Sequence, residues 1–182
     1  MPPTNIPRPD PNTYWVVPDQ FLAGEYPFSY NATDAHAKLA RYLDAGIDSF
    51  IDLTESHELE PYLPHLPAGV EYQRMSVRDL SVPSVCHMTG ILDHIDTSLA
   101  AGRRVYVHCW GGVGRTGTTV GCWLQRHGRT GEEALQEIAR HWSTVAKSHR
   151  VPRSPETREQ AEWVLSWQRL SSAAPSIRKE DR

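Results

Sequence analysis

Apolar and polar residues alternate along this chain in a way that predicts short strands separated by amphipathic helices. Clusters of β-branched and aromatic residues predict buried strands over residues 49–53, 70–75 and 105–107. Apolar residues that recur at helical spacing, bounded by capping and breaking residues, predict the helices. The expected helices span residues 33–45, 84–102, 118–127, 130–142 and 155–170.

Local signals set several of these boundaries. Ser84 is a good N-cap for the second helix, and Thr130 with Glu133 forms a capping box for the fourth. Pro155 suits the first position of the last helix, because its missing N–H would have no partner there. The stretch between Ser143 and Arg153 is expected to be a linker.

The alternation of strands and helices predicts an α/β fold. Its centre would be a mostly parallel sheet flanked by helices on both faces. Near the N-terminus, residues 14–17 and 20–24 are strand candidates on either side of the turn signal Pro18-Asp19. They predict an N-terminal edge hairpin.

Length and composition divide the chain into three parts. Residues 1–13 hold five prolines and predict a flexible or surface-hugging arm. Residues 14–170 are expected to form a single catalytic domain, since 182 residues suit one full core. Residues 171–182 form a polar tail that is expected to fray.

Charge, hydrophobic run length and cysteine content argue against nucleic-acid or membrane partners, disulfides and a zinc site. The 19 basic and 22 acidic residues give a net charge of −3 without a long single-sign cluster, so neither nucleic acid nor a membrane surface is indicated. No apolar run is long enough to span a bilayer, and the first residues lack a signal segment. Three scattered cysteines suit neither a disulfide framework nor a zinc site. We therefore expect a soluble, cytoplasmic protein, most simply a monomer.

One stretch carries the chemistry. The strand over 105–107 leads into His108-Cys109-Trp110-Gly111-Gly112-Val113-Gly114-Arg115-Thr116-Gly117 and then into a helix. Unpaired backbone N–H groups at such a junction, together with the helix dipole, bind anions. A loop curled around one tetrahedral anion would place Cys109 at its bottom, and Arg115 would close the ring with two parallel donors. The positive surroundings favour a thiolate nucleophile, so the stretch predicts a phospho-enzyme.

The segment His108-Cys109-x5-Arg115-Thr116-Gly117 resembles the signature of the cysteine-dependent protein tyrosine and dual-specificity phosphatases. The likeness extends over roughly residues 14–170, and the compact length is similar to the atypical dual-specificity branch. It implies a cysteine-phosphatase-like fold that needs no metal or cofactor. It also implies a general acid on a loop upstream of the cysteine, where Asp79 lies, with Asp52 as the second choice.

The resemblance assigns a role to each site residue. Cys109 would be the nucleophile, Arg115 would bind the phosphoryl oxygens, and Asp79 would protonate the leaving group and then activate water. Thr116 would donate a hydrogen bond to the departing thiolate. The backbone amides of Trp110, Gly111, Gly112, Val113, Gly114 and Arg115 would bind the equatorial oxygens.

Other roles stay open between two interpretations. Trp110 is expected either at the mouth of the site or in core packing, and Gln160 either orients water or is an exposed helical glutamine. His108 is expected to hold the loop by a hydrogen bond rather than to act as a base. Cys86 and Cys122 fit small core residues better than redox partners of the nucleophile. Arg74 and Arg78 fit a solvated pair better than a substrate guide.

Three rival functions use the same loop. Gly112 to Gly117 fits the dinucleotide pattern Gly-x-Gly-x-x-Gly, but no strand about 20 residues later ends in an acidic residue. A catalytically silent phosphate-binding module and a sulfur-transfer loop are the others. Phosphoinositide-directed members of the family that the loop resembles have lysine-rich versions of it, and this loop interior holds no lysine. The resemblance therefore favours a phosphorylated protein or peptide substrate over a phosphoinositide or another small phosphate monoester. Phosphotyrosine is favoured if the cleft is deep, with phosphoserine and phosphothreonine as alternatives.

Overall fold

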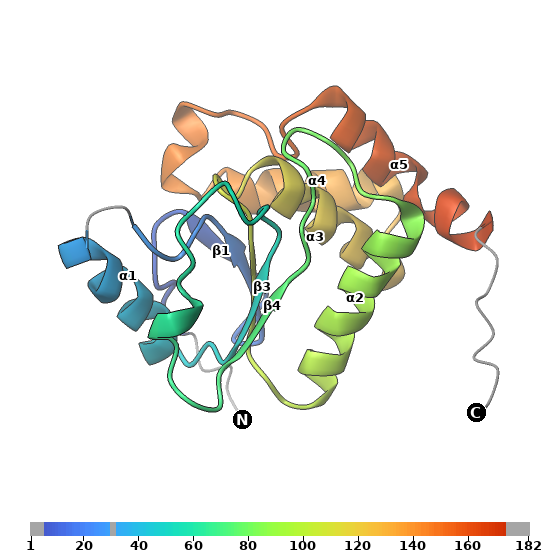
Figure 1. Ribbon diagram of the computed structural model, residues 1–182. Helices are drawn as coiled ribbons and strands as arrows, with labels where there is room; N and C mark the ends of the chain where they lie inside the picture. The colour runs from blue at the N-terminus through green and yellow to red at the C-terminus, as the bar shows by residue number, and fades with distance from the viewer. Residues whose placement is uncertain (1–5, 30–31, 174–182) are drawn as a thin grey trace, which may run out of the picture.

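The computed structural model describes residues 6–29 and 32–173 of the chain (Figure 1). Its elements follow one another in the order β1 (Thr13–Val17), β2 (Phe21–Gly24), α1 (Ala32–Asp44), β3 (Ser49–Asp52), η1 (Leu63–His65), β4 (Glu71–Arg74), α2 (Val85–Ala100), β5 (Val105–His108), α3 (Gly114–Arg126), α4 (Gly131–Trp142), η2 (Ala146–His149) and α5 (Arg158–Ala173). None of the helices in these described ranges has the length and apolar character that crossing a membrane requires.

The sheet has five strands in the order β1-β2-β5-β3-β4. The pairs β2/β5, β5/β3 and β3/β4 are parallel, and β1 pairs antiparallel with β2 at the edge. The predicted α/β fold with an N-terminal edge hairpin is therefore confirmed. Gly24 and Asp52 both pair with His108, and Asp52 also pairs with Arg74, so the four parallel strands end level with one another. The loops that follow them converge on one edge of the sheet.

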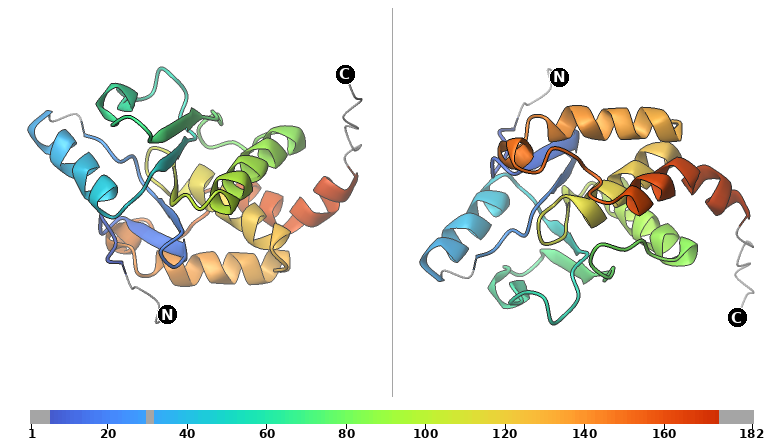
Figure 2. Two further views of the ribbon diagram at one scale, coloured as in Figure 1. Left: turned by 90° about the horizontal axis from the view of Figure 1, so that it is seen from below. Right: turned by 90° about the horizontal axis from the view of Figure 1, so that it is seen from above.

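Helices cover both faces of this sheet (Figures 1 and 2). α1 and the segment around η1 lie on one face, and α2, α3, α4 and α5 lie on the other. Residues along β5 alternate between the two cores: Val105 and Val107 belong to the larger one, while Tyr106 belongs to the core beneath α1. This alternation is the period of two that a strand imposes on its side chains.

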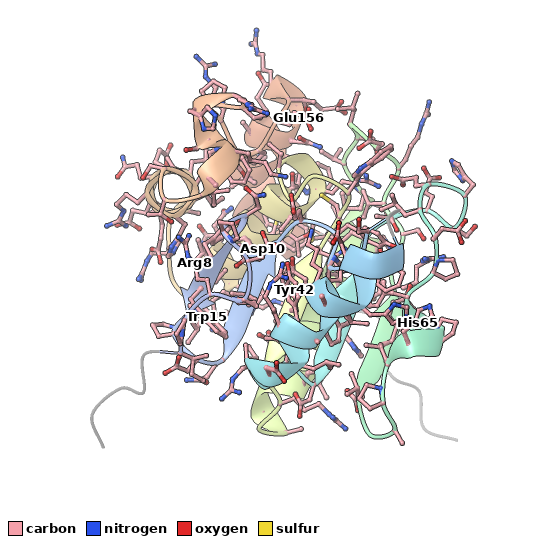
Figure 3. All side chains as sticks on the ribbon, turned by 90° about the vertical axis from the view of Figure 1, so that its left-hand side faces the viewer. Arg8, Asp10, Trp15, Tyr42, His65 and Glu156 are labelled. Carbon is pink, nitrogen blue, oxygen red and sulfur yellow. The ribbon has the colours of Figure 1, made fainter. Side chains whose placement is uncertain are left out.

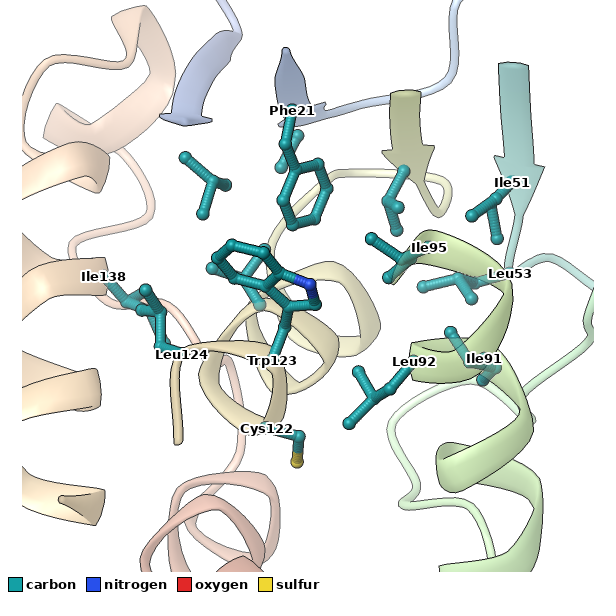
Figure 4. Packing of buried hydrophobic residues seen from close by; sticks show 14 of the residues in the cluster. Phe21, Ile51, Leu53, Ile91, Leu92, Ile95, Cys122, Trp123, Leu124 and Ile138 are labelled. Carbon is teal, nitrogen blue, oxygen red and sulfur yellow. The ribbon is translucent and has the colours of Figure 1, made fainter. Parts of the chain in front are cut away.

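The larger core joins the sheet to α2, α3 and α4 (Figure 4). Trp123 of α3 meets Phe21 of β2 edge to face, with ring centroids 5.1 Å apart. Ile91, Leu92 and Ile95 of α2 close the same core and are fully buried. Burying each such side chain contributes about 1.5–3 kcal/mol. The core therefore fixes α3, and with it the loop that precedes α3.

The start of α3 differs from the prediction. The helix begins at Gly114, not at Thr118, so Arg115 and Thr116 lie in its first turn. Glycine disfavours helix, which is why the sequence pattern placed the start later. Close packing requires these glycines: a Cβ on Gly117 would lie 2.2 Å from Ser154 Oγ, and one on Gly114 would lie 2.8 Å from the Gln160 amide.

The C-terminal region also needs correction. α5 begins at Arg158 rather than at Pro155, because Thr157 Oγ1 accepts a hydrogen bond from Gln160 N–H at 3.1 Å and caps the helix there. The stretch expected to be a plain linker contains η2. The predicted N-cap at Ser84 and the capping box of Thr130 with Glu133 are confirmed.

Residues 6–12 of the proline-rich arm lie against the domain. Arg8 Nη1 donates to Thr13 O at 2.8 Å, and Arg41 Nε of α1 donates to Pro9 O at 2.9 Å. Asp10 is buried, and Figure 3 shows it with Arg8 beside β1. These contacts correct the expectation of flexibility for this part of the arm and agree with the surface-hugging alternative. The first five residues, and the tail after residue 173, fall outside the described residues.

Candidate active site

The loop that joins β5 to α3, residues 109–115, is called the phosphate loop below. Cys109 follows the last residue of β5 and is buried, with 3% of its surface exposed. Thr116 Oγ1 lies 3.1 Å from Cys109 Sγ and donates a hydrogen bond to it. Gly112 has a φ of +71°, and a Cβ there would lie 2.4 Å from the Gly24 carbonyl carbon. The loop can curl this tightly against β2 because glycine tolerates both constraints.

Arg115 lies in the first turn of α3 with only 1% of its side chain exposed. Its Nη1 donates to Glu58 Oε1 at 2.6 Å and to Val77 O at 3.0 Å, and its Nη2 donates to Glu58 Oε2 at 2.8 Å. Its Nε is buried and has no partner among the residues that the structure describes. A buried, unpaired guanidinium N–H is costly unless a ligand supplies an acceptor. A phosphate oxygen could accept a hydrogen bond from this N–H.

Glu58 is a site residue that the sequence analysis missed. It lies in the loop after β3 and also accepts a hydrogen bond from Glu55 N–H at 2.7 Å. Burial would raise the pKa of Glu58, but the hydrogen bonds from Arg115 and from Glu55 N–H outweigh burial and hold this pKa below its usual range. The signal in the sequence was indirect: a buried arginine needs a carboxylate, and the loop after β3 begins beside the end of β5.

Asp79 reaches the same arginine from the loop after β4. Its Oδ1 lies 3.0 Å from Arg115 Nη2, and its side chain is 54% exposed. The base of this loop is fixed, since Val77 N–H donates to Leu53 O at 2.9 Å. Leu80, the next residue, has a φ of +57° and is half exposed. The expected acid therefore lies at the solvent side of the phosphate loop.

Asp52, the second choice for the acid, has no free oxygen. Its Oδ1 accepts from Thr54 N–H and Oγ1, at 2.8 and 2.6 Å, and its Oδ2 accepts from Tyr72 and Arg74. Burial would raise the pKa of Asp52, but the electrostatic interaction with nearby His108 and these hydrogen bonds hold this pKa below its usual range. Asp52 is a structural carboxylate. Arg74 pairs with it at 3.1 Å, so the interpretation of Arg74 as half of a solvated pair is wrong, whereas Arg78 is exposed.

His108 is fully buried beneath the loop. Its Nδ1 lies 3.1 Å from Cys109 O, which can only accept, so Nδ1–H is the donor. In the neutral ring Nε2 then accepts a hydrogen bond from the Tyr62 hydroxyl, 2.7 Å away. Burial lowers the pKa of His108, although the nearby Asp52 opposes the shift. The ring is placed to hold the first carbonyl of the phosphate loop.

Gln160 is fully buried, so the alternative of an exposed helical glutamine is wrong. Its Oε1 accepts from Glu156 N–H and Thr157 N–H, at 3.1 and 3.0 Å. Its Nε2 donates to Ser81 O at 3.2 Å. Ser81 lies in the loop between β4 and α2, residues 75–84, which carries Asp79 and is called the acid loop below. Gln160 therefore joins the start of α5 to the acid loop while packing on Gly114 of the phosphate loop.

The expectations for Trp110 and the two other cysteines have different outcomes. Trp110 is 51% exposed, which excludes core packing and leaves it on the surface of the loop. Cys122 is a buried core residue, as expected, and burial raises its pKa. Cys86 is exposed, contrary to expectation, because it lies off the face of α2 on which Met88 is buried.

A second ring of contacts braces the phosphate loop from outside. Tyr26 N–H donates to Trp110 O at 3.0 Å. Lys147 of η2 donates from Nζ to Gly111 O at 2.9 Å and pairs with Glu25. Glu25 also pairs with Lys38 of α1 at 2.7 Å. Across residues 6–29 and 32–173, no group of three His, Cys, Asp or Glu side chains is placed to hold a metal ion.

The chain is similar to several known proteins. A family model described as "Polymorphic toxin system, DSP-PTPase phosphatase" matches residues 23–129, which is more than half of the chain. The dual specificity protein phosphatase CDC14C of Symphalangus syndactylus is 25% identical over 122 residues, covering 63% of this chain and 24% of the relative. The phosphatidylglycerophosphate phosphatase PTPMT2 of Arabidopsis thaliana is 30% identical over 117 residues, covering 63% of this chain and 48% of the relative. The chain thus spans about a quarter to a half of these relatives' lengths.

Solved structures share the architecture. The crystal structure of Tk-PTP in the active form is 28% identical, with a TM-score of 0.71, and the match covers 90% of this chain and 99% of that one. The crystal structure of PTPMT1 in complex with PI(5)P is 24% identical with a TM-score of 0.68, over 89% of this chain and 97% of that one. The second likeness is one of fold.

Proposed function

This chain belongs to the family of DSP-PTPase phosphatases of polymorphic toxin systems, and we propose that it dephosphorylates phosphoproteins through a phosphocysteine intermediate. The family match confirms the resemblance that the phosphate loop indicated. The observation that carries the proposal is the ion pair between Asp79 Oδ1 and Arg115 Nη2, at 3.0 Å. It brings the carboxyl group of Asp79 from a separate loop to the anion-binding group beside the thiol.

The first chemical step transfers the phosphoryl group to sulfur. The Cys109 thiolate attacks phosphorus while the bond to the leaving oxygen breaks and an S–P bond forms. Asp79 gives its proton to the leaving oxygen. Arg115 offers its unpaired Nε to an equatorial oxygen, and backbone N–H groups of the phosphate loop are available for the others.

The second step releases phosphate. Asp79, now a carboxylate, takes a proton from water as the water oxygen attacks phosphorus and the S–P bond breaks. The electron pair returns to sulfur, where the Thr116 hydroxyl, 3.1 Å away, donates a hydrogen bond to the thiolate. The side-chain amide of Gln160 is hydrogen-bonded to Ser81 O and to the start of α5. These bonds favour a role in positioning the acid loop over a role in orienting water.

A phosphorylated protein or peptide is the preferred substrate. The interior of the phosphate loop, Trp110 to Gly114, holds no lysine, and half-exposed Trp110 and Leu80 offer apolar surface to an aryl group. A phosphoinositide or another phospholipid headgroup is the second candidate, because the relative at 30% identity is a phosphatidylglycerophosphate phosphatase. The cysteine usage favours a cytoplasmic location, and we propose a monomer.

A panel of substrates tests the proposal. Peptides carrying phosphotyrosine, phosphoserine or phosphothreonine are compared with phosphoinositides and phosphatidylglycerophosphate at equal phosphate concentration, with phosphate release as readout. We expect phosphotyrosine peptides to give the highest kcat/KM. A higher kcat/KM on the lipids would replace the first candidate with the second, and binding of phosphopeptides without phosphate release would identify a silent phosphate-binding module.

A further inference from the structure

A pocket of about 170 Å³ adjoins the phosphate loop on the side of α1. It is lined by Glu25, Tyr26, Phe28, Ser29, Lys38 and Trp110. Trp110 belongs to the phosphate loop itself, and the Tyr26 N–H bond to Trp110 O attaches the opposite wall to the loop. A group that enters this pocket therefore lies beside the phosphate loop.

The charges at this pocket do not cancel. Glu25 pairs with Lys38 at 2.7 Å and also with Lys147, so two ammonium groups share one carboxylate. Burial would raise the pKa of Glu25, but the hydrogen bonds and charges of both lysines hold it below its usual range, and the carboxylate stays ionised. The cluster carries a net charge of about +1 in a site where water is partly excluded.

Lys38 is the lysine that remains available. Lys147 donates to both Glu25 and Gly111 O, and it is not among the residues that line the pocket. Lys38 makes one hydrogen bond, to Glu25, within the described part of the chain, and its side chain is 16% exposed and lines the pocket. An ammonium group has three donors. Lys38 can therefore bind a second anion without releasing Glu25.

We propose that this pocket is a substrate subsite that binds an acidic side chain flanking the phosphorylated residue. The inference rests on the proposed phosphoprotein phosphatase function. The aromatic rings of Tyr26, Phe28 and Trp110 would pack on the methylene groups of a glutamate or aspartate, and Lys38 would donate to its carboxylate. Since an extended peptide advances by about 3.3–3.6 Å per residue, a side chain one or two positions from the phosphoresidue falls in an adjoining pocket.

The experiment compares matched phosphotyrosine peptides. They differ only in having Glu or Gln at each position from two before to two after the phosphoresidue, and the readout is the ratio of kcat/KM for the Glu and Gln forms. We expect the wild type to prefer Glu by about threefold to tenfold at one position, and the preference to shrink as salt is added. In Lys38→Met the ratio falls to about one, and in Lys38→Arg it is retained. Arg140→Gln, a substitution at an exposed arginine of α4, is the matched control and keeps the wild-type ratio.

Each other outcome is decisive. Turnover of all peptides with a Glu/Gln ratio near one overturns the subsite and leaves the phosphatase function standing. If no phosphate ester is hydrolysed, the proposed function fails instead. Equilibrium binding of the same labelled peptides then decides the subsite: a preference for Glu that Lys38→Met abolishes supports it, and equal binding overturns it. A Lys38-dependent preference for phosphoinositide vesicles over every acidic peptide would assign the pocket to a lipid phosphate and overturn the inference.

Discussion

Glu58 holds Arg115 with two parallel hydrogen bonds, from Nη1 to Oε1 at 2.6 Å and from Nη2 to Oε2 at 2.8 Å. Both side chains are almost fully buried. The pair fixes the plane of the guanidinium, because such a bidentate contact leaves little freedom of rotation. The direction of the unpaired Nε–H is therefore fixed as well, and this group can donate to a phosphate oxygen.

Replacing Glu58 with glutamine should mainly lower kcat. The substitution would keep the size of the side chain but remove its charge and one acceptor, so the guanidinium would be less well oriented, which costs about tenfold to a hundredfold in rate. The measurement is steady-state turnover of an aryl phosphate, together with the melting temperature to establish folding. Glu60→Gln, at an exposed position nearby, is the control. An unchanged kcat in folded Glu58→Gln would remove the positioning role.

Replacing Asp79 with asparagine should produce a loss that depends on the leaving group. Without a proton donor, esters of weakly acidic alcohols should lose about a hundredfold or more, while esters of acidic phenols should lose less. The slope of log kcat/KM against leaving-group pKa measures this difference. Asp44→Asn, at the C-terminal end of α1 and away from the phosphate loop, should keep the wild-type slope. If Asp79→Asn kept it too, another group would have to be the acid.

Replacing Thr116 with valine should slow the second step. The hydroxyl, 3.1 Å from Cys109 Sγ, would no longer stabilise the departing thiolate, so the phosphocysteine should accumulate. A rapid burst of the phenol product before the steady state would report this accumulation in stopped-flow measurements. Thr116→Ser keeps the hydroxyl and should show a steady state close to that of the wild type. Equal behaviour of the valine and serine variants would argue against a role for the hydroxyl.

Acid should destabilise the fold partly through His108. Burial lowers its pKa in the folded protein from the ordinary 6.5, so the unfolded chain binds a proton that the folded chain does not. The stability from the neutral ring is fully present above about pH 6.5 and is lost as the pH falls from there toward the lowered pKa. Melting temperatures from pH 8 to 5 measure the slope. His108→Gln should be less stable at pH 8 and show a flatter decline, and an unchanged slope would contradict this account.

The fold was largely predictable because strand and helix periods were clear. Val105 to Val107 alternates between two cores, and the capping box of Thr130 with Glu133 formed as expected. Helix starts that depend on tertiary packing were not predictable. Gly114 and Gly117 disfavour helix locally, yet both lie in α3, where Gln160 and Ser154 pack so closely that a Cβ would not fit.

The site was predictable where its residues are adjacent in sequence. The spacing of Cys109, Arg115 and Thr116 indicated their proximity, since one loop carries them. Glu58 and Lys147 could not be found in this way. Their contacts with Arg115 and Gly111 arise only when loops from different strands and helices meet at one edge of the sheet.

Hydrolysis of para-nitrophenyl phosphate without added metal tests the central claim most directly. We expect the wild type to release para-nitrophenol and Cys109→Ser to lose activity by about a thousandfold or more, because a serine hydroxyl at this site is a far weaker nucleophile. Cys86→Ser, at the exposed cysteine on α2, should keep the wild-type rate. An inactive wild type, or a Cys109→Ser variant as active as its parent, would contradict the account.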